Sequence, residues 1–409
     1  MDEALRRYQL DLARAQMSRR RFMSIAALGG VSAALAACGG GTTASSAPSA
    51  AASTPASAAP PSTAPSAAPA SAPASQAAAA SYPPPESDLF MFNWSQYFAD
   101  DNKALFEKTF NSKITYDTYP SNEELLAKLQ AGGKGQYDVA VPTAEFSKTL
   151  ADGGFLAKLD KSRLPNLANV NQKFLTLPFD PNDDYIVPKD WGTTGVIYRG
   201  QVKEPMTSWK DFFDLSKGKY SGKSLVVNSP GDVFVAPLRL HGFDVNTTDK
   251  DQLEIARQEL MALRPHLQSI DSDNYPDTLR NGDALLALAW NGTAYLMQQE
   301  KDYKDTGYTI PSEGTIIWVD TWVLLDEAPH PNAAYTFLNW IQDPDVQVTE
   351  SLYAGYASAN DKAMALLPPE FANSPAIAVP PDVLANLSVS TDQSGNQQRA
   401  DIWAEFVAG

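Results

Sequence analysis

The sequence IIWVDTWVLL, at residues 316–325, predicts a β-strand because β-branched and aromatic residues dominate it. Alternate side chains of a strand share a face, so we expect Trp318, Asp320 and Trp322 on one face and the intervening residues on the other. That face would hold a carboxylate between two indole rings. An organic cation can pair with the carboxylate and pack against the rings. The alternative is a buried strand whose aspartate caps a neighbouring turn.

Upstream of this strand, the chain alternates strand-like and helix-like segments. Strands are predicted at residues 89–92, 114–119 and 137–142, with helical segments between them. Such an order is typical of a parallel α/β sheet, whose binding crevice lies at the carboxyl ends of the strands. Residues 93–97 and 142–145 follow two of these strands, so we expect them in the crevice.

A second α/β series follows residues 185–198, which are strand-like but interrupted by glycines. Together with residues 316–325 they are expected to cross between two lobes, and two such crossings predict a hinged cleft. Ser121 to Glu124 has the form of a capping box, which predicts a helix start. The remaining predicted elements are strands at 224–228 and 284–290 and helices at 253–263, 333–341, 344–353 and 399–406.

The composition excludes several classes of function. The formal net charge is −16, although the first 38 residues contain six arginines against three acids, so the rest of the chain is more acidic still. This balance argues against nucleic-acid binding and suits a cationic ligand. One cysteine excludes disulfides within the chain, and three scattered histidines provide no metal-ligand spacing. We therefore expect no metal, no cofactor and no catalytic residues.

The N-terminus predicts export and a lipid anchor. Ser18 to Met23 resembles a twin-arginine signal, and the apolar run that follows is too short to cross a membrane. The sequence LAACG ends this run and resembles the lipobox of bacterial lipoproteins, in which Cys38 would carry the lipid. General secretion remains an alternative to twin-arginine export. The predicted location is the outer face of the cytoplasmic membrane.

These features divide the chain into four parts. Residues 1–38 form the predicted signal peptide, and residues 39–85, rich in Ala, Ser and Pro, form a predicted disordered tether. Lobe 1 is predicted to contain residues 86–193 plus 319–364, and lobe 2 residues 194–318 plus 365–409.

Motifs distributed over the folded part resemble the extracytoplasmic spermidine/putrescine-binding proteins of polyamine ABC importers. They are FNWSQY at 92–97, YDVAVPT at 137–143, PFDPN at 178–182, WGTTG at 191–195, WNG at 290–292, IWVD at 317–320 and GYASAN at 355–360. The resemblance extends from about residue 89 to residue 406. It implies a non-enzymatic, two-lobed periplasmic-binding-protein fold.

The resemblance also implies a ligand pocket at particular residues. Aromatic side chains would enclose the aliphatic stem of the polyamine, and these are Trp94, Tyr97, Trp290, Trp318 and Tyr356. Asp320 and Asp232 would each pair with an ammonium group. Ser95, Thr143 and Gln393 would accept hydrogen bonds. From the residues alone, Tyr97 could equally belong to the core, and Asp232 could simply favour a helix N-terminus.

The chain departs from the family pattern at several positions. Gln96, which is also predicted to bind the ligand, stands where the family usually has an acid. Ser229 replaces a carboxylate of the spermidine type, and Thr293 replaces an aspartate of the putrescine type. Glu145 lies near a pocket position that is usually aromatic or apolar. Glu145 either adds a ligand carboxylate or is a solvated acid in the first turn of a helix.

The predicted function is capture of a polyamine, putrescine or spermidine, by a monomeric lipoprotein that delivers it to an ABC permease. The alternatives are a receptor for another small organic cation or a zwitterion, an exported enzyme, and a sensor that docks on a receptor kinase.

Overall fold

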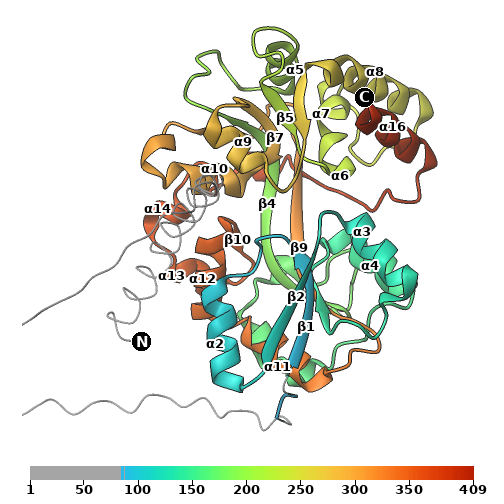
Figure 1. Ribbon diagram of the computed structural model, residues 1–409, viewed down its shortest axis with the longest axis vertical. Helices are drawn as coiled ribbons and strands as arrows, with labels where there is room; N and C mark the ends of the chain where they lie inside the picture. The colour runs from blue at the N-terminus through green and yellow to red at the C-terminus, as the bar shows by residue number, and fades with distance from the viewer. Residues whose placement is uncertain (1–83, 87) are drawn as a thin grey trace, which may run out of the picture. The chain divides into compact units, whose positions relative to one another are not determined.

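Two long antiparallel strands, β4 (Ile186–Tyr198) and β9 (Ile316–Leu324), organise the folded chain. The computed structural model describes residues 84–86 and 88–409. In Figure 1, β4 and β9 run from one group of strands to the other. The predicted signal peptide, Cys38 and nearly all of the predicted tether lie outside the described residues, and the predicted lobe boundaries stay a prediction.

The sheet has the strand order β2-β1-β3-β9-β4-β7-β5-β6. On one side of the central pair, β1 (Asp88–Trp94) is parallel to β2 (Lys113–Tyr119) and β3 (Val139–Ala140). On the other side, β5 (Ser224–Val226) is parallel to β6 (Leu267–Ile270) and β7 (Leu286–Trp290). Three short strands pair with the two central strands: β8 (Gly307–Thr309) and β10 (Ala357–Ser358) with β4, and β11 (Ser388–Val389) with β9. We call the β1–β3 side lobe 1 and the β5–β8 side lobe 2.

Helices cover both faces of the lobe 1 sheet. The alternation along β9 explains this, because Trp322 packs with residues of α2, α11 and α12, whereas Val323 packs with residues of α3 and α4. The bounds are α2 Asp100–Phe110, α3 Asn122–Lys128, α4 Ala144–Asp152, α11 Pro331–Trp340 and α12 Pro344–Ala354. Trp322 is fully buried between Phe98 and Phe337, in the core of lobe 1.

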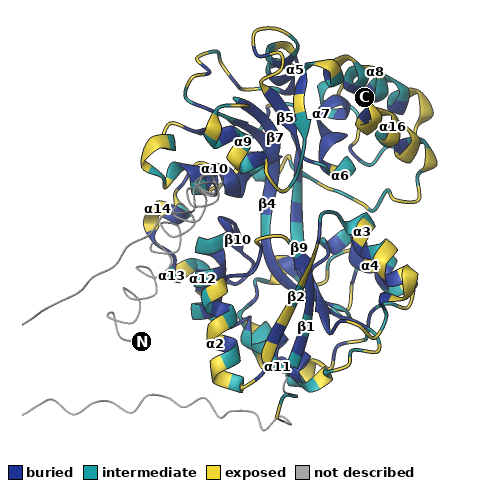
Figure 2. Cartoon of the chain, viewed as in Figure 1, coloured by how far each residue is buried: buried dark blue, intermediate teal, exposed yellow. Residues whose placement is uncertain are grey.

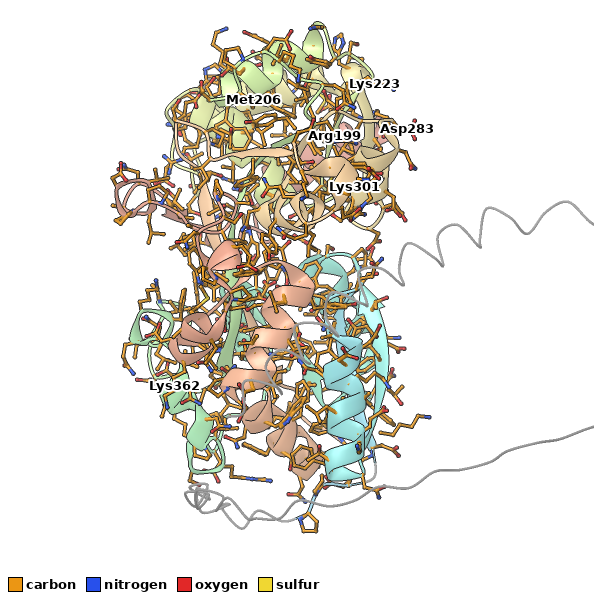
Figure 3. All side chains as sticks on the ribbon, turned by 90° about the vertical axis from the view of Figure 1, so that its left-hand side faces the viewer. Arg199, Met206, Lys223, Asp283, Lys301 and Lys362 are labelled. Atoms are coloured by element: carbon orange, nitrogen blue, oxygen red, sulfur yellow. The ribbon has the colours of Figure 1, made fainter. Side chains whose placement is uncertain are left out.

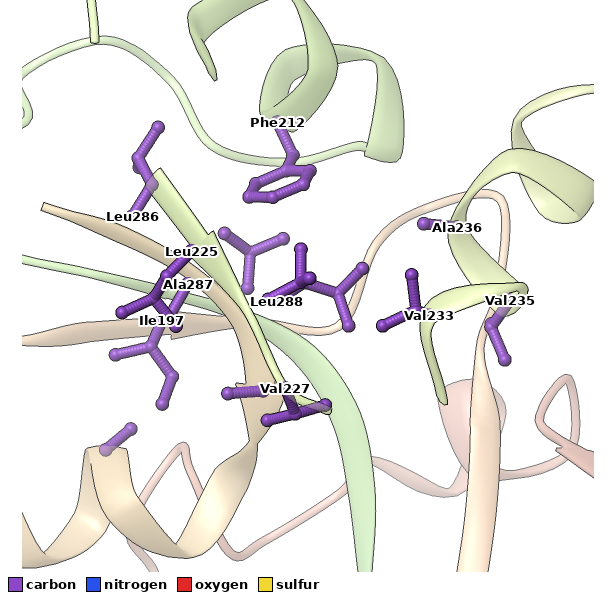
Figure 4. Packing of buried hydrophobic residues seen from close by; sticks show 14 of the residues in the cluster. Ile197, Phe212, Leu225, Val227, Val233, Val235, Ala236, Leu286, Ala287 and Leu288 are labelled. Carbon is purple, nitrogen blue, oxygen red and sulfur yellow. The ribbon is translucent and has the colours of Figure 1, made fainter. Parts of the chain in front are cut away.

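Lobe 2 is built around one apolar cluster. Phe212 of α5 packs over Leu225 of β5 and Leu288 of β7 (Figure 4). Its helices are α5 Trp209–Lys217, α6 Pro230–Val233, α7 Val235–Leu240, α8 Lys250–Leu263, α9 Tyr275–Asn281 and α10 Asn291–Gln298. The C-terminal helices are α13 Asp361–Leu366, α14 Pro369–Ala372, α15 Pro381–Leu384 and α16 Gln397–Ala408, of which α16 packs against α8.

Burial follows the expected layering. The strands are largely buried, and exposed residues lie on the outer faces of the helices (Figure 2). Charged side chains such as Lys223, Lys301 and Lys362 are exposed, whereas Arg199 is buried (Figure 3). Short turns of other helical types connect the elements: η1 Leu129–Gly133, η2 Lys161–Arg163, η3 Pro165–Asn169, η4 Gln172–Phe174, η5 Arg264–His266 and η6 Lys301–Tyr303.

The glycines at 185–198 do not interrupt the strand, contrary to the prediction. A Cβ at Gly192 would lie 2.3 Å from the Trp318 ring, and one at Gly195 would lie 2.4 Å from the carbonyl oxygen of Thr309. Glycine is therefore required for close packing and not for a turn. The predicted capping box is confirmed, because the Ser121 hydroxyl accepts from the backbone N–H of Glu124 at the start of α3.

Among residues 84–86 and 88–409, no helix has both the length and the apolar character needed to span a membrane. The same residues contain no group of three metal-ligating side chains.

Candidate functional site

Asp320 and Trp318 lie where β9 passes between the lobes. Both are nearly buried, with 6% and 7% of their surface exposed. The Trp318 ring stands perpendicular to Tyr356, with 4.8 Å between ring centroids. Asp320 Oδ1 and Trp318 Nε1 have no hydrogen-bond partner among the described residues. Buried polar atoms without partners cost free energy, so these two atoms point to a ligand that would satisfy them.

Asp320 belongs to a buried polar network that the sequence did not predict. The Tyr97 hydroxyl lies 2.7 Å from Asp320 Oδ2 and 2.5 Å from Asp190 Oδ1. The Lys189 ammonium lies 2.5 Å from Asp190 Oδ2 and 3.5 Å from the centroid of the Tyr97 ring. Lys189 is completely buried. Tyr97, which could equally have been a core residue, therefore directly contacts the predicted ligand carboxylate.

A register shift in β4 explains this arrangement. Pro188 pairs with Thr321 and Asp190 pairs with Asp320, so Lys189 is an extra residue in the ladder. A bulge re-aims the side chains around it, which allows the neighbouring Lys189 and Asp190 to meet. Strict alternation would have placed these two side chains on opposite faces. The local signal for the bulge in VPKDWG is Pro188, because proline within a sheet is confined to edge strands, strand starts and bulges.

The environment of Asp320 opposes its ionisation. Burial, followed by the charge of Asp190, raises the pKa of Asp320 to about 8, while the Tyr97 hydrogen bond and the Lys189 charge act in the other direction. Burial also raises the pKa of Tyr97 well above its usual range, so its hydroxyl keeps its proton.

Asp232 is positioned at α6, in the other lobe. The Ser229 hydroxyl donates to Asp232 Oδ2 at 2.6 Å, and the Thr194 hydroxyl donates to Oδ1. Burial raises the pKa of Asp232, and these hydrogen bonds partly oppose the shift. Thr194 of β4 pairs with Trp290 at the end of β7. This pairing places the Trp290 ring beside Thr194, whose hydroxyl donates to Asp232. Thus Ser229, which replaces a carboxylate of the spermidine type, donates a hydrogen bond to Asp232 and orients it.

Glu145 lies in the first turn of α4 and is half-buried. Burial, then the charges of Asp320 and Asp232, raise the pKa of Glu145 to about 8. Thr143, just before α4, forms a bridge with Asp320 and accepts a 2.8 Å hydrogen bond from Asn122. The three acids therefore share one electrostatic environment, in which their negative charges oppose each other's ionisation.

The predicted aromatic residues are distributed around these acids. Trp94 is half-buried, and its indole N–H donates to the Val141 carbonyl at 2.7 Å. Trp290 is half-buried and perpendicular to Tyr275, with ring centroids 6.0 Å apart. Tyr356 packs between Trp318 and Tyr97, and it requires the absence of a side chain at Gly292.

Three predicted residues are less closely associated with this site. Ser95 and Gln96 are exposed, and Gln96 has a left-handed backbone with φ 53°. The Gln393 side-chain amide donates to Thr391 at 2.7 Å, so its described partner is local. The structure does not bring these three into contact with Asp320.

Two further acids were missed by the sequence reasoning. The Asp392 carboxylate accepts from the Thr149 hydroxyl of α4. Burial, then Asp392 and Asp232, raise the pKa of half-buried Glu123 in α3. Glu123 is the second residue of the helix that its capping box starts, and that local role gave no signal of a site. The acidic side chains around the site therefore create a strongly negative electrostatic potential, which favours a cationic ligand.

Comparison with known proteins agrees with this geometry. Residues 102–379 match the family described as bacterial extracellular solute-binding protein. A spermidine/putrescine-binding periplasmic protein of Escherichia coli K12 is 35% identical over 299 residues, covering 72% of this chain and 84% of the relative. A putrescine-binding periplasmic protein of the same strain is 33% identical over 343 residues, covering 79% and 92%.

A solved structure from Listeria monocytogenes, assigned to a spermidine/putrescine ABC transporter, superposes with a TM-score of 0.73 at 28% identity. The match covers 78% of this chain and 99% of that one. It confirms the predicted periplasmic-binding-protein fold. The family description supports the predicted extracytoplasmic location, and its members are solute-binding proteins and not enzymes. The chain belongs to the bacterial extracellular solute-binding proteins, in the group that includes the spermidine/putrescine-binding proteins of ABC transporters.

Proposed function

We propose that the protein captures a linear polyamine between its lobes, with one ammonium on Asp320 and another on Asp232. The observation that carries this proposal is the unpartnered Oδ1 of Asp320, buried beside the Trp318 ring. A carboxylate oxygen accepts hydrogen bonds only, and an ammonium group donates only, so the two satisfy each other. The methylene stem would pack against Trp94, Trp290 and Tyr356.

The identity of the polyamine depends on how many acids contribute. Asp320 and Asp232 match the two charges of putrescine, and Glu145 would supply a third for spermidine. Glu145 supports the longer ligand because it is half-buried at the start of α4, close enough to both aspartates for their charges to raise its pKa. Aromatic enclosure would then select ligands by the length of their stem.

A zwitterionic amine is a second candidate, and a specific atom favours it. Trp318 Nε1 is a buried donor without a partner among the described residues. An ammonium group cannot accept from it, whereas a ligand carboxylate can. Titration with 4-aminobutyrate, which has the same four carbons as putrescine but a carboxylate in place of one terminal aminomethyl group, separates the two candidates.

The test of the function is a titration followed by calorimetry and by tryptophan fluorescence. Putrescine, spermidine and spermine should bind with micromolar or tighter affinity, whereas choline, which has no N–H donor on its cationic nitrogen, should bind far more weakly. A response to 4-aminobutyrate alone would favour the zwitterion. No saturable response to any linear polyamine below millimolar concentration would exclude the proposal.

Delivery to an ABC permease and anchoring through Cys38 complete the proposed function. The lipobox LAACG and the family's association with ABC transporters support both. Fractionation of cells that express the full chain tests the anchor. The wild type should sediment with membranes, and Cys38→Ala should be released in soluble form. Equal membrane recovery of both would refute lipidation at Cys38.

A further inference from the structure

The contacts of Tyr97 fix the number of protons in the buried network. Its oxygen lies within hydrogen-bond distance of two carboxyl oxygens, one on Asp190 and one on Asp320. A tyrosine hydroxyl carries one proton, and an ionised carboxylate carries none. Two ionised carboxylates would therefore leave one of these short O···O contacts without a hydrogen. One of the two carboxyl groups must supply a second proton.

The position of Lys189 decides which carboxyl group carries that proton. Its ammonium forms a buried ion pair with Asp190 at 2.5 Å. Asp320 forms no ion pair within the described part of the chain, and its Oδ1 lacks any hydrogen-bond partner there. An uncompensated buried carboxylate is costly, whereas a buried ion pair is at least partly compensated. The second proton therefore belongs on Asp320 Oδ2, donated to the Tyr97 oxygen, while Tyr97 donates to Asp190.

We propose that Asp320 is a neutral carboxylic acid in the ligand-free protein and that an ammonium group binding at its Oδ1 expels this proton to solvent. This inference rests on the proposed function and adds to it the release of one proton for each ligand bound. In the step, the Asp320 O–H bond breaks, the proton passes to water or buffer, and the carboxylate forms an ion pair with the ammonium. The contact between Tyr97 and Asp320 Oδ2, now without a hydrogen, lengthens. Lys189 and Asp190 act as positioning residues, because their ion pair keeps Asp190 ionised and the Tyr97 hydroxyl then donates its proton to Asp190.

The surrounding charges favour the same assignment. Only Lys189 is positive among the titratable groups that the structure places near Asp320 by contact or by electrostatic interaction. The other titratable groups near Asp320 lie on the elements packed around it and are Tyr97, Tyr119, Glu145, Asp190, Asp232 and Tyr356. Glu350 interacts electrostatically with Lys189. Burial and Asp190 raise the pKa of Asp320, in agreement with the proton count made from geometry alone.

The first test needs no ligand. Infrared difference spectra at pH 6.5 should show the C=O stretching band of a protonated carboxyl group in the wild type, and Asp320→Asn should lack it. Glu145→Gln is the matched control, because Glu145 is the other acid of the site with a strongly raised pKa. The Asp320 band should persist in that variant. An Asp320→Asn spectrum that loses no protonated-carboxyl intensity would overturn the proposal.

The second test counts protons during binding. In the Glu145→Gln background, calorimetry of putrescine binding at pH 6.5 in buffers of different ionisation enthalpy should show release of about one proton per ligand. At pH values below the pKa of Asp320, the affinity for putrescine should therefore increase about tenfold for each unit by which the pH rises. Ligand binding without proton release would overturn the inference and leave the proposed function intact. Absence of binding would exclude the function, while the infrared test would still decide the proton.

A double variant tests the positioning role. Lys189→Met with Asp190→Asn removes a buried ion pair as a unit, a replacement that is often tolerated. Tyr97 can then donate to Asp320, which no longer needs a proton of its own. The variant should lose the Asp320 band at pH 6.5 and release markedly less than one proton per ligand. Retention of the full band would show that burial alone holds the proton and would refute the role of Lys189 and Asp190. If this variant does not fold, the infrared and proton-release tests, which keep the ion pair intact, still decide whether Asp320 carries the proton.

Discussion

Asp190 of β4 lies directly opposite Asp320 of β9 in the central ladder, and one tyrosine hydroxyl contacts both carboxyl groups. The pairing brings two acids of like charge together at the crossing between the lobes. Among the residues that the structure describes, only Asp190 has a positively charged side chain beside it, that of Lys189. The other therefore offers a buried, uncompensated acceptor to a ligand ammonium, and ligand affinity should depend on it.

Asp320→Asn should weaken polyamine binding by about 2–5 kcal/mol, because truncating one partner of a buried charge pair leaves the ligand ammonium uncompensated. Calorimetric titration measures the loss. The exposed Asp283→Asn is the matched control and should bind as the wild type does. Near-wild-type affinity of Asp320→Asn would instead make Asp320 a purely structural residue of the strand.

Glu145→Gln should weaken binding of spermidine by about 1.5–3 kcal/mol if Glu145 pairs with a third amine. Its effect on putrescine should be smaller, since two acids already match two charges. Glu124→Gln, exposed on α3, controls for the loss of one negative charge from the same lobe. An unchanged affinity for both ligands would identify Glu145 as a first-turn acid without a ligand.

The ligand-free protein should lose stability as the pH rises from about 5 to 8. Asp320 and Glu145 have pKa values of about 8 in the folded protein, above their ordinary values. Between the two values the folded state binds more protons than the unfolded state, so the free energy of unfolding falls as pH rises. Thermal melts across this range measure the slope. Asp320→Asn should flatten the slope, and an unaltered slope would contradict the raised pKa of Asp320.

Gly192→Ala should reduce both stability and affinity. The added Cβ would lie 2.3 Å from the Trp318 ring and 2.4 Å from the side-chain oxygen of Asn291, so Trp318 must move. Overpacking of this kind costs about 1–3 kcal/mol. Gly395→Ala is the control, because its Cβ would meet nothing within 4 Å. Equal melting temperatures and equal affinities of the two variants would show that the contact between Gly192 and Trp318 has no effect.

Much of this arrangement could be predicted from local patterns. Alternation along residues 316–325 placed Trp318, Asp320 and Trp322 on one face, and all three are buried. The capping box at Ser121 and the parallel order of the first three strands also followed from sequence. These features depend on residues that are close together in the chain, so the spacing of residue types along the sequence is enough to predict them.

The parts that were missed depend on contacts between distant residues. The bulge at Lys189 arises from the register of β4 against β9, and Pro188 marks it only as one of several possible positions for a proline in a sheet. Gly192 suggested a break in the strand, although its purpose is to make room for the Trp318 ring. The ligand roles of Ser95, Gln96 and Gln393 rested on family resemblance alone, and they stay predictions.

The most direct test of the account is calorimetric titration of the wild type and of Asp320→Asn with putrescine and spermidine. We predict saturable binding of at least one of them to the wild type, and a loss of about 2–5 kcal/mol in the variant. Wild-type protein that binds neither amine below millimolar concentration, or a variant that binds as tightly as the wild type, would contradict the central claim that Asp320 is the buried partner of a ligand ammonium.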